Sequence, residues 1–238
     1  MLVRLTVKKI IEKKMMMTRK FYLLVFLFSL SLVVYSQEKD FGIWYGISAE
    51  HKLTKKLELD LLANIRTFND ASKIEEAFFE GGLEYSKSKH LAFAGTYRLS
   101  RNIENNNSLY FQHKMFLDIK GNLPVGKIDF TGRLRFETRI KTYIRNEDDK
   151  FPDYTGRIKL KVLYKTQTFP VDPYLYVETF CPMFSDKSGT IGKNRFSAGL
   201  KFSIIKRHAV EVEYIFQRDY QPHLADMNIL SVNYDIKF

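Results

Sequence analysis

Apolar and charged residues alternate one by one along residues 127–144. From Ile128 to Ile140 every even position is apolar, small or hydroxylic, whereas the odd positions are mostly charged, Arg133 and Arg135 among them. A period of two is that of a β-strand with one apolar and one polar face. The run is about twice as long as a usual strand in a soluble sheet. It therefore predicts a strand that crosses a membrane, with lipid on the even side and a barrel lumen on the odd side.

The same alternation recurs in eleven segments of the chain. In the seventh segment, Ile158, Leu160 and Val162 alternate with Arg157 and Lys159. No connection between the segments is long enough for the crossover that a parallel pair requires, so we expect antiparallel hairpins. The segments are 41–51, 57–68, 76–86, 90–100, 108–120, 127–143, 154–166, 173–182, 195–205, 209–220 and 228–238.

The connections between these segments alternate between short and long. Outer-membrane barrels have short periplasmic turns and longer external loops, so we expect the C-terminus in the periplasm and 221–227 outside. Bacterial single-chain barrels usually have an even number of strands. Either the first segment, Phe41–His51, is not a wall strand or a strand is missing from the set, and we predict an all-β, up-and-down transmembrane barrel of 10–12 strands. The short connections are 52–56, 87–89, 121–126, 167–172 and 206–208, and the long ones are 69–75, 101–107, 144–153, 183–194 and 221–227.

An apolar run of 14 residues, FYLLVFLFSLSLVV at 21–34, follows two basic residues near the start of the chain. It is too short for a comfortable transmembrane helix but is typical of a signal-peptide core. Cleavage before Gln37 predicts a signal peptide over 1–36 and a single barrel domain over 37–238. The cluster Met15–Met17 leaves open a later start of translation. No cysteine follows the run, so a lipoprotein anchor is not expected.

Composition narrows the function classes. The 14 Tyr and 20 Phe are many for a soluble domain, and aromatic girdles at both membrane interfaces account for them. The formal net charge is +11, but the leader carries seven basic residues and one acidic, which leaves +5 for the remainder. Without a concentrated basic block, a nucleic-acid partner is not expected. The single cysteine, Cys181, excludes an internal disulfide and a cysteine-based metal site.

The competing fold is a soluble secreted barrel or sandwich, in which the apolar face would fill the interior. Most segments are 11–17 residues long, which is long for that class. In addition, Tyr234, Ile236 and Phe238 alternate up to a C-terminal Phe. This ending resembles the recognition signal read by the barrel assembly machinery. The resemblance implies that machinery as a partner and outer-membrane lipid as the surroundings.

Three stretches carry a family resemblance: FGIWYG at 41–46, HKLTKKLELD at 51–60 and the hairpin 209–238. They resemble an uncharacterised outer-membrane barrel family of Bacteroidota-type Gram-negative bacteria, a domain of unknown function. The resemblance covers most of the mature chain through loose strand patterns. It implies fold and location, and it implies no functional residue.

Charges on the odd faces of segments 127–143 and 154–166 predict a basic stripe down one lumen wall. Symmetric closure of their loop would place Arg135 near Lys161 and Arg139 near Arg157, with acids on the other walls. One interpretation is a narrow channel that favours anions. The other is a lumen filled by crossing ion pairs, since barrels of this size have little spare interior. The charges expected to line the lumen are Arg133, Arg135, Glu137, Arg139, Lys141, Arg157, Lys159, Lys161, Glu58, Asp60, Glu80, Glu84, Glu178, Glu211 and Glu213.

His113 is an ionisable side chain in the middle of an outward face. Outer-membrane lipid hydrolases place a catalytic His on the barrel exterior, paired with a Ser. We expect the outward neighbours of His113 to be Gly95 and Leu134, with no hydroxyl nucleophile in reach. Acids and a His at the external rim would suit a peptide hydrolase, and the loop candidates are Asp219, His223 and Asp226.

The acidic run Glu147–Asp153 lacks the ordered spacing of a calcium loop. Phosphate-binding glycine loops, nucleophile elbows and clustered His ligands are absent from the sequence, so we expect no cofactor. The sequence thus favours a non-enzymatic, porin-like outer-membrane barrel, with a structural role or a narrow path for a small solute. An outer-membrane barrel enzyme that acts on lipid or peptide at the outer rim is the alternative.

Overall fold

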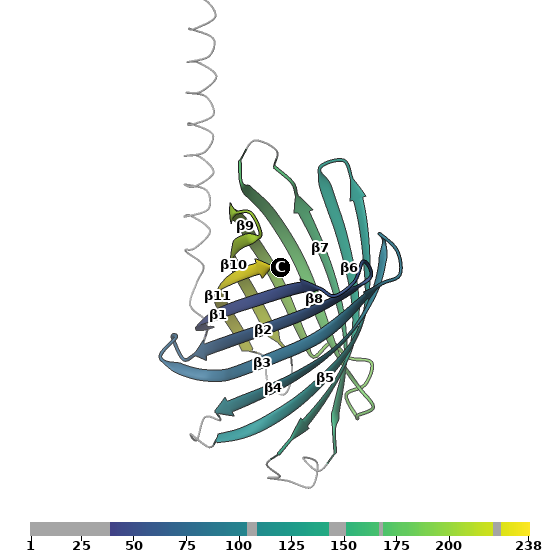
Figure 1. Cartoon of the computed structure of the whole chain (residues 1–238). Helices are drawn as coiled ribbons and strands as arrows, with labels where there is room; N and C mark the ends of the chain where they lie inside the picture. The colour runs from purple at the N-terminus through teal and green to yellow at the C-terminus, as the bar shows by residue number, and fades with distance from the viewer. Residues whose placement is uncertain (1–38, 104–108, 143–150, 167–168, 221–224) are drawn as a thin grey trace, which may run out of the picture. The chain divides into compact units, whose positions relative to one another are not determined.

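The computed structural model describes residues 39–103, 109–142, 151–166, 169–220 and 225–238, which form a closed all-β barrel (Figure 1). Among these residues, no helix is long and apolar enough to cross a membrane. Eleven strands make the wall: β1 Lys39–Lys52, β2 Leu57–Phe68, β3 Lys73–Ser86, β4 Leu91–Ile103, β5 Leu109–Val125, β6 Ile128–Lys141, β7 Asp153–Tyr164, β8 Val171–Met183, β9 Lys193–Ile205, β10 His208–Asp219 and β11 Ala225–Lys237.

Each strand pairs with its neighbours in the chain, and β1 closes the barrel against β11. The predicted count of 10–12 strands is confirmed at eleven, and the first predicted segment, 41–51, is a wall strand. Antiparallel pairing holds for ten of the eleven pairs, but it is wrong for the closing pair, which is parallel. Strand direction alternates along an up-and-down sheet, so the first and last of an odd number of strands run the same way. The predicted signal peptide, 1–36, lies outside the described residues and stays a prediction.

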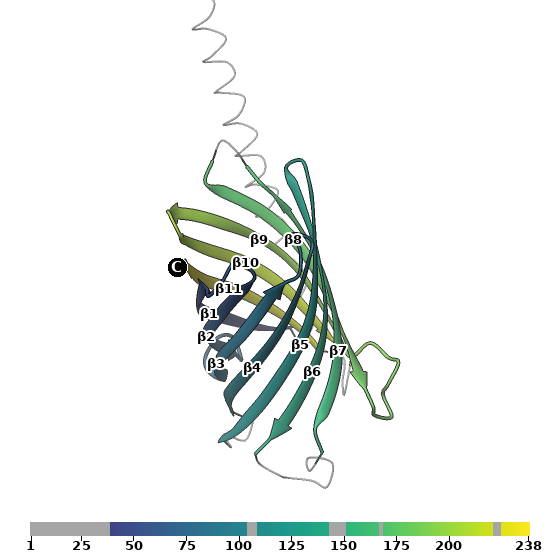
Figure 2. The ribbon, with the colours of Figure 1, turned by 45° about the vertical axis from the view of Figure 1, so that its right-hand side comes forward.

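The connections are shorter at one end of the barrel than at the other, and the strands run obliquely between the two ends (Figure 2). β1 starts at one end, where Asn69 donates its backbone N–H to the Asp40 carboxylate over 3.0 Å. The chain ends at the other, where the Phe238 N–H donates to the Glu50 carbonyl over 2.8 Å. The short-turn rim is the end where β1 is followed by β2, β3 by β4, β5 by β6, β7 by β8 and β9 by β10, and the long-loop rim is the opposite end.

The hairpin of β5 and β6 is tighter than the sequence suggests. A connection at 121–126 was expected, but β5 continues to Val125, which pairs with Ile128. The turn is therefore only Gly126 and Lys127. Gly126 has a φ of 61°, a conformation that glycine adopts without steric cost and that two-residue hairpins require. Glycine, asparagine and proline near the end of β5 are typical of a turn, so the sequence predicted a connection where the strand continues.

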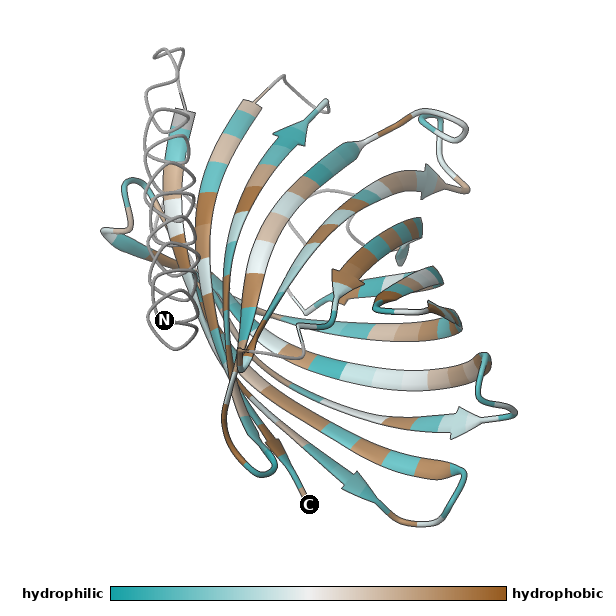
Figure 3. Cartoon of the chain, turned by 90° about the horizontal axis from the view of Figure 1, so that it is seen from above, coloured by the Kyte–Doolittle hydropathy of each residue, from teal (hydrophilic) through white to brown (hydrophobic). Residues whose placement is uncertain are grey.

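The two faces of the wall follow the alternation of the sequence. Figure 3 shows it as bands of hydrophilic and hydrophobic residues along each strand. Outward side chains are apolar and exposed, for example Leu117 at 65% and Leu175 at 62%. Inward side chains are mostly polar and buried, and Glu178 is 2% exposed. The inward positions are even in β1–β5 and β8 and odd in the other strands.

A small apolar cluster also lies inside the barrel. Trp44, Ile215 and Ile229 pack together, with Met227 against them. Ile215 and Ile229 lie directly opposite each other on β10 and β11. The alternation of the sequence predicts the inward direction of these positions, but their packing against one another depends on the pairing of β1, β10 and β11, so this cluster was not predicted.

Candidate functional site in the barrel interior

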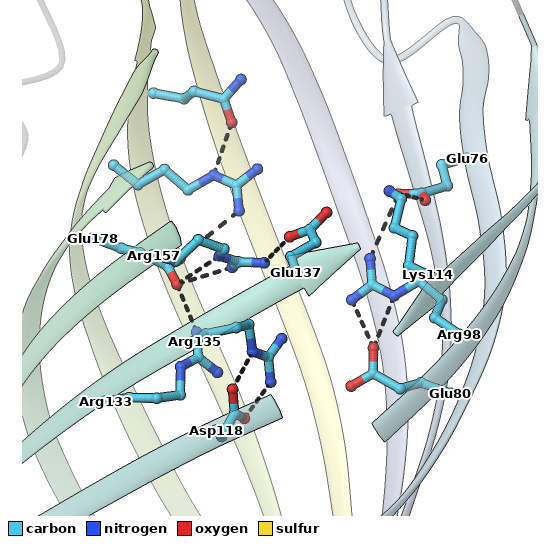
Figure 4. Close-up of polar contacts among 12 residues, drawn as sticks. Glu76, Glu80, Arg98, Lys114, Asp118, Arg133, Arg135, Glu137, Arg157 and Glu178 are labelled. Carbon is cyan, nitrogen blue, oxygen red and sulfur yellow. Dashed lines mark hydrogen bonds and ion pairs between the residues drawn. The ribbon is translucent and has the colours of Figure 1, made fainter. Parts of the chain in front are cut away.

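The Glu178 carboxylate of β8 is the centre of one ion-pair network (Figure 4). It lies 2.5 Å from Arg133 of β6 and 2.8 Å from Arg157 of β7. Arg195 of β9 lies 4.0 Å away, and Arg157 also contacts Glu137 at 3.1 Å. Because each of these side chains is largely buried, loss of the shared acid would leave several charges without compensation.

A second network surrounds Glu76 of β3, which is 4% exposed. Its carboxylate lies 2.9 Å from Arg66 of β2 and 3.1 Å from Lys114 of β5. Arg98 of β4 lies 3.9 Å from Glu76 and 2.7 Å from Glu80 (Figure 4). The buried Glu76 carboxylate thus contacts three cations, as Glu178 does.

A buried fork of two hydrogen bonds joins β5 and β6 beside the Glu178 network. Arg135 donates from Nε and Nη2 to the two oxygens of Asp118 over 2.6 and 2.7 Å. The guanidinium lies 4.3 Å from the ring of Phe116, which is 1% exposed. Paired donors of this kind fix both groups in one orientation.

Aromatic rings separate the guanidinium groups near the long-loop rim. Arg66 lies 4.0 Å from the ring of Trp44, and Arg195 lies 4.9 Å from it. Arg195 also contacts Phe180 at 4.8 Å, and Arg98 lies 3.7 Å from Phe78. Cation–π contacts of this kind are attractive, and more so when the partners are desolvated. Sequence reasoning missed these rings, although they share the inward parity of the charges beside them.

A cavity of about 960 Å³ lies at the long-loop end of the interior. Both networks contribute to its wall, together with residues from the ends of β6, β7, β8, β9 and β10. Its charged and aromatic lining includes Trp44, Arg66, Glu76, Arg98, Lys114, Glu137, Arg139, Asp153, Arg157, Phe180, Lys193, Arg195 and Asp219.

The short-turn half of the interior uses lysine and tyrosine instead. Tyr174 and Tyr176 of β8 donate to the Glu213 carboxylate over 2.6 and 2.7 Å. The ammonium of Lys161 lies 3.8 Å from the Tyr174 ring, and that of Lys159 lies 3.5 Å from the Tyr176 ring. These contacts connect β7, β8 and β10 across the interior.

Carboxylates predominate in the rest of that half. Glu58 lies directly opposite Glu84 in the β2–β3 pair. Lys120 contacts Glu84 at 2.5 Å. Farther round the wall, Lys201 lies between two acids, Glu211 at 2.5 Å and Asp235 at 3.2 Å.

The predicted register of β6 and β7 is wrong by four residues. Arg135 lies opposite Arg157 rather than near Lys161, and Arg139 lies opposite Asp153. The prediction assumed that the loop closes symmetrically about its midpoint. A shift by an even number of residues leaves every side chain on its face, so the alternation could not reveal the error. Lys141 is the last residue of β6.

His113 also has different neighbours from those expected. It lies opposite Leu99 and Ile140, not Gly95 and Leu134. Its Nδ1 lies 2.6 Å from the hydroxyl of Tyr97, so a hydroxyl group is in reach, contrary to the expectation. The rough register used for the prediction could not resolve this diagonal contact.

The structure does not bring the rim candidates together. Asp219 pairs with Lys193 at 2.9 Å at an inward position, whereas Asp226 pairs with Arg218 at 2.7 Å at an outward one. His223 lies outside the described residues, as does most of the run 147–153. Within the described part of the chain, no group of three or more His, Cys, Asp or Glu side chains could hold a metal ion.

The C-terminal residues of the expected assembly signal lie at the short-turn rim. Tyr234 of β11 places its hydroxyl 2.8 Å from Nδ1 of His208. Ile236 pairs with His208 across β10 and β11, and Phe238, just after the strand, is 61% exposed. The ring of Phe238 lies 6.4 Å from that of His51, and the assembly signal stays a prediction.

A family model described as "Protein of unknown function (DUF2490)" matches residues 41–228. That range begins in β1 and ends in β11, so the match covers the barrel. A search of curated proteins finds no match.

Proposed function

The chain belongs to the DUF2490 family of proteins of unknown function, and we propose that it spans a bacterial outer membrane as a barrel with a closed interior. Its role is structural, without a steady flow of solute. The C-terminus then lies in the periplasm and the long-loop rim outside. Family membership brings no activity with it, and the support comes from the two faces of the barrel wall.

The apolar outer face is the observation that carries the proposal. Leu134 of β6, Leu160 of β7 and Leu175 of β8 are 53%, 58% and 62% exposed. Soluble monomers rarely expose apolar patches beyond a few hundred Å². Transfer of one such side chain from water to an apolar environment is favourable by about 1.5–3 kcal/mol. The outer face is therefore more stable against acyl chains than in water.

The interior supports a structural role better than a narrow channel. The Arg135–Asp118 fork, the Glu178 network and the ring of Phe116 extend inward from several strands and are largely buried. For a solute to cross the whole barrel, these ion pairs would have to separate, and each separation leaves a buried charge uncompensated.

Cell fractionation and planar-bilayer recording test the two halves of the proposal. We expect the protein in the outer-membrane fraction and, after refolding, no steady current above background. Release by osmotic shock would overturn the membrane assignment. A large ohmic conductance of the intact barrel would overturn the closed interior.

Leu160→Arg tests whether the outer face contacts lipid. Arginine near the bilayer midplane costs about 2–4 kcal/mol, so we expect that loss in the free energy of unfolding, measured by urea titration in phospholipid vesicles. The matched control is Leu53→Arg in the turn 53–56, where the leucine is 48% exposed outside any strand. Equal losses for the two variants would contradict a lipid-facing wall.

A further inference from the structure

We propose that the cavity at the long-loop end binds a free organic oxyanion, a small solute with carboxylate or phosphate groups, on Trp44, Arg66 and Arg195. The inference goes beyond the proposed function, on which it rests only for the side of the membrane that supplies the solute.

The three donors lie together and retain unused hydrogen-bonding capacity. Both guanidinium groups contact the Trp44 ring, at 4.0 Å for Arg66 and 4.9 Å for Arg195. Trp44 is 7% exposed, and neither its Nε1 nor Nε of Arg66 has a hydrogen-bond partner among the described residues. Arg195 donates to Gln217 over 2.8 Å, and its closest carboxylate contact is Glu178 at 4.0 Å. Both unpaired nitrogens are closed to solvent, but all three side chains line the cavity, where an oxyanion would accept hydrogen bonds from the guanidinium groups.

The charge around the cavity favours an anion. Among the described residues, eight Arg and Lys side chains and six Asp and Glu side chains line the cavity. A cleft with an excess of one sign inside a low-dielectric wall concentrates ions of the opposite sign. The cations are Arg66, Arg98, Lys114, Arg139, Arg157, Lys187, Lys193 and Arg195, and the carboxylates are Glu75, Glu76, Glu137, Asp153, Asp186 and Asp219.

The size and lining of the cavity indicate an organic ligand. A volume of about 960 Å³ far exceeds one inorganic oxyanion and lies at the upper end of small-molecule sites. Trp44, Phe180, Pro182 and Met183 add apolar surface to the wall. The cavity lies inside the strand ring, away from the apolar outer face, so a free solute suits it better than a lipid phosphate.

The binding test uses Trp44 as its reporter, because it is the single tryptophan of the chain. The mature full-length protein, refolded in detergent, is titrated with citrate and with inorganic phosphate at constant ionic strength. We expect a saturable change in tryptophan emission with citrate, a weaker one with phosphate and none with chloride. A response that does not saturate, or that chloride reproduces, would overturn the proposal.

Arg195→Gln assigns the signal to the site, and we expect it to weaken citrate binding at least tenfold. The matched control is Arg218→Gln, because Arg218 lies near the same rim on the outward side and pairs with Asp226. The control should bind citrate like the parent protein. Equal binding by both variants would sink the assignment to Arg195.

Two further arms keep the test decisive. If Arg195→Gln does not show the heat-dependent gel mobility of a folded barrel, Arg66→Gln is tested in its place. We expect the same loss of citrate affinity. Phosphatidic acid in mixed micelles tests the lipid source, and saturation by this lipid but not by citrate would refute a free solute. The titration in detergent does not depend on where the protein lies in the cell. If citrate does not bind but the protein is found in the outer-membrane fraction, this proposal fails and the proposed function stands.

Discussion

The two halves of the barrel interior pair their buried charges with different types of side chain. Near the long-loop rim, arginines stack on aromatic rings and share buried acids, as Arg157 and Arg195 do around Glu178. Near the short-turn rim, lysine lies between acids, and tyrosine hydroxyls donate to Glu213. A guanidinium offers five donors in a plane and can serve several acceptors while it stacks, whereas an ammonium is a compact charge. The inner face therefore has an arginine-rich end and a carboxylate-rich end.

This difference decides what the loss of one carboxylate does. In the long-loop half an acid is shared by several cations, so its removal exposes like charges to one another. In the short-turn half a cation is shared by several acids, so removal of an acid relieves repulsion. The inward carboxylates of that half include Glu58, Asp60, Glu84, Glu211, Glu213 and Asp235, and its lysines include Lys120, Lys159, Lys161 and Lys201.

The largest effect is expected for Glu178→Gln. The substitution keeps the size of the side chain but leaves Arg133 and Arg157 without their shared charge. Removal of one partner from a buried network typically costs about 3–5 kcal/mol, and we expect that loss in urea unfolding monitored in detergent micelles.

The matched substitution in the other half is Glu84→Gln. Glu84 lies opposite Glu58, and loss of its contact with Lys120 is offset by weaker repulsion. We expect a change below about 1 kcal/mol, because pairs of this exposure contribute little. A loss as large as that of Glu178→Gln would abolish the contrast between the halves.

Gly199→Val tests how tightly the tyrosine arrangement is packed. A Cβ at Gly199 would lie 2.6 Å from Oη and 2.8 Å from Cε2 of Tyr174, so the ring would have to leave Glu213. Overpacking of this kind costs about 1–3 kcal/mol, measured as above. Gly95→Val is the control, because its Cβ would meet nothing closer than 4.0 Å. If both variants unfold at the same urea concentration, the ring contact does not hold this half together.

The smallest effect expected is a gain. Glu58→Lys replaces a like-charge pair with Glu84 by an opposite-charge pair, which is worth about 0.2–1 kcal/mol across two strands. The urea midpoint should rise slightly. Glu80→Lys, which removes the 2.7 Å contact with Arg98, should lower it. Destabilisation by both would show that the short-turn half does not carry excess negative charge.

Alternation in the sequence was enough to predict the strands and the direction of most side chains. The period-two pattern around Leu134 and Arg135 places each residue on a face regardless of its partner, because side chains of a strand point alternately to opposite sides. The largest error in a strand boundary is at 121–126, where turn-forming residues misled the prediction and the strand continues to Val125.

The register and the partners could not be predicted in this way. Arg135 binds Asp118 across one strand pair, and Glu178 joins residues from three other strands. Such contacts depend on the stagger between strands and on the closure of the ring. The hydroxyl of Tyr97 beside His113 depends on the same stagger.

By itself, the sequence determined that this protein is a barrel of long alternating strands with one apolar and one charged face, because a local period encodes both. Only the tertiary structure decided that eleven strands close through a parallel pair, that Trp44 lies between two arginines, and that the inner charges divide into two unlike halves. The physical reason is that alternation is unchanged by a shift of two residues, whereas an ion pair requires atoms of distant strands to meet within about 4 Å.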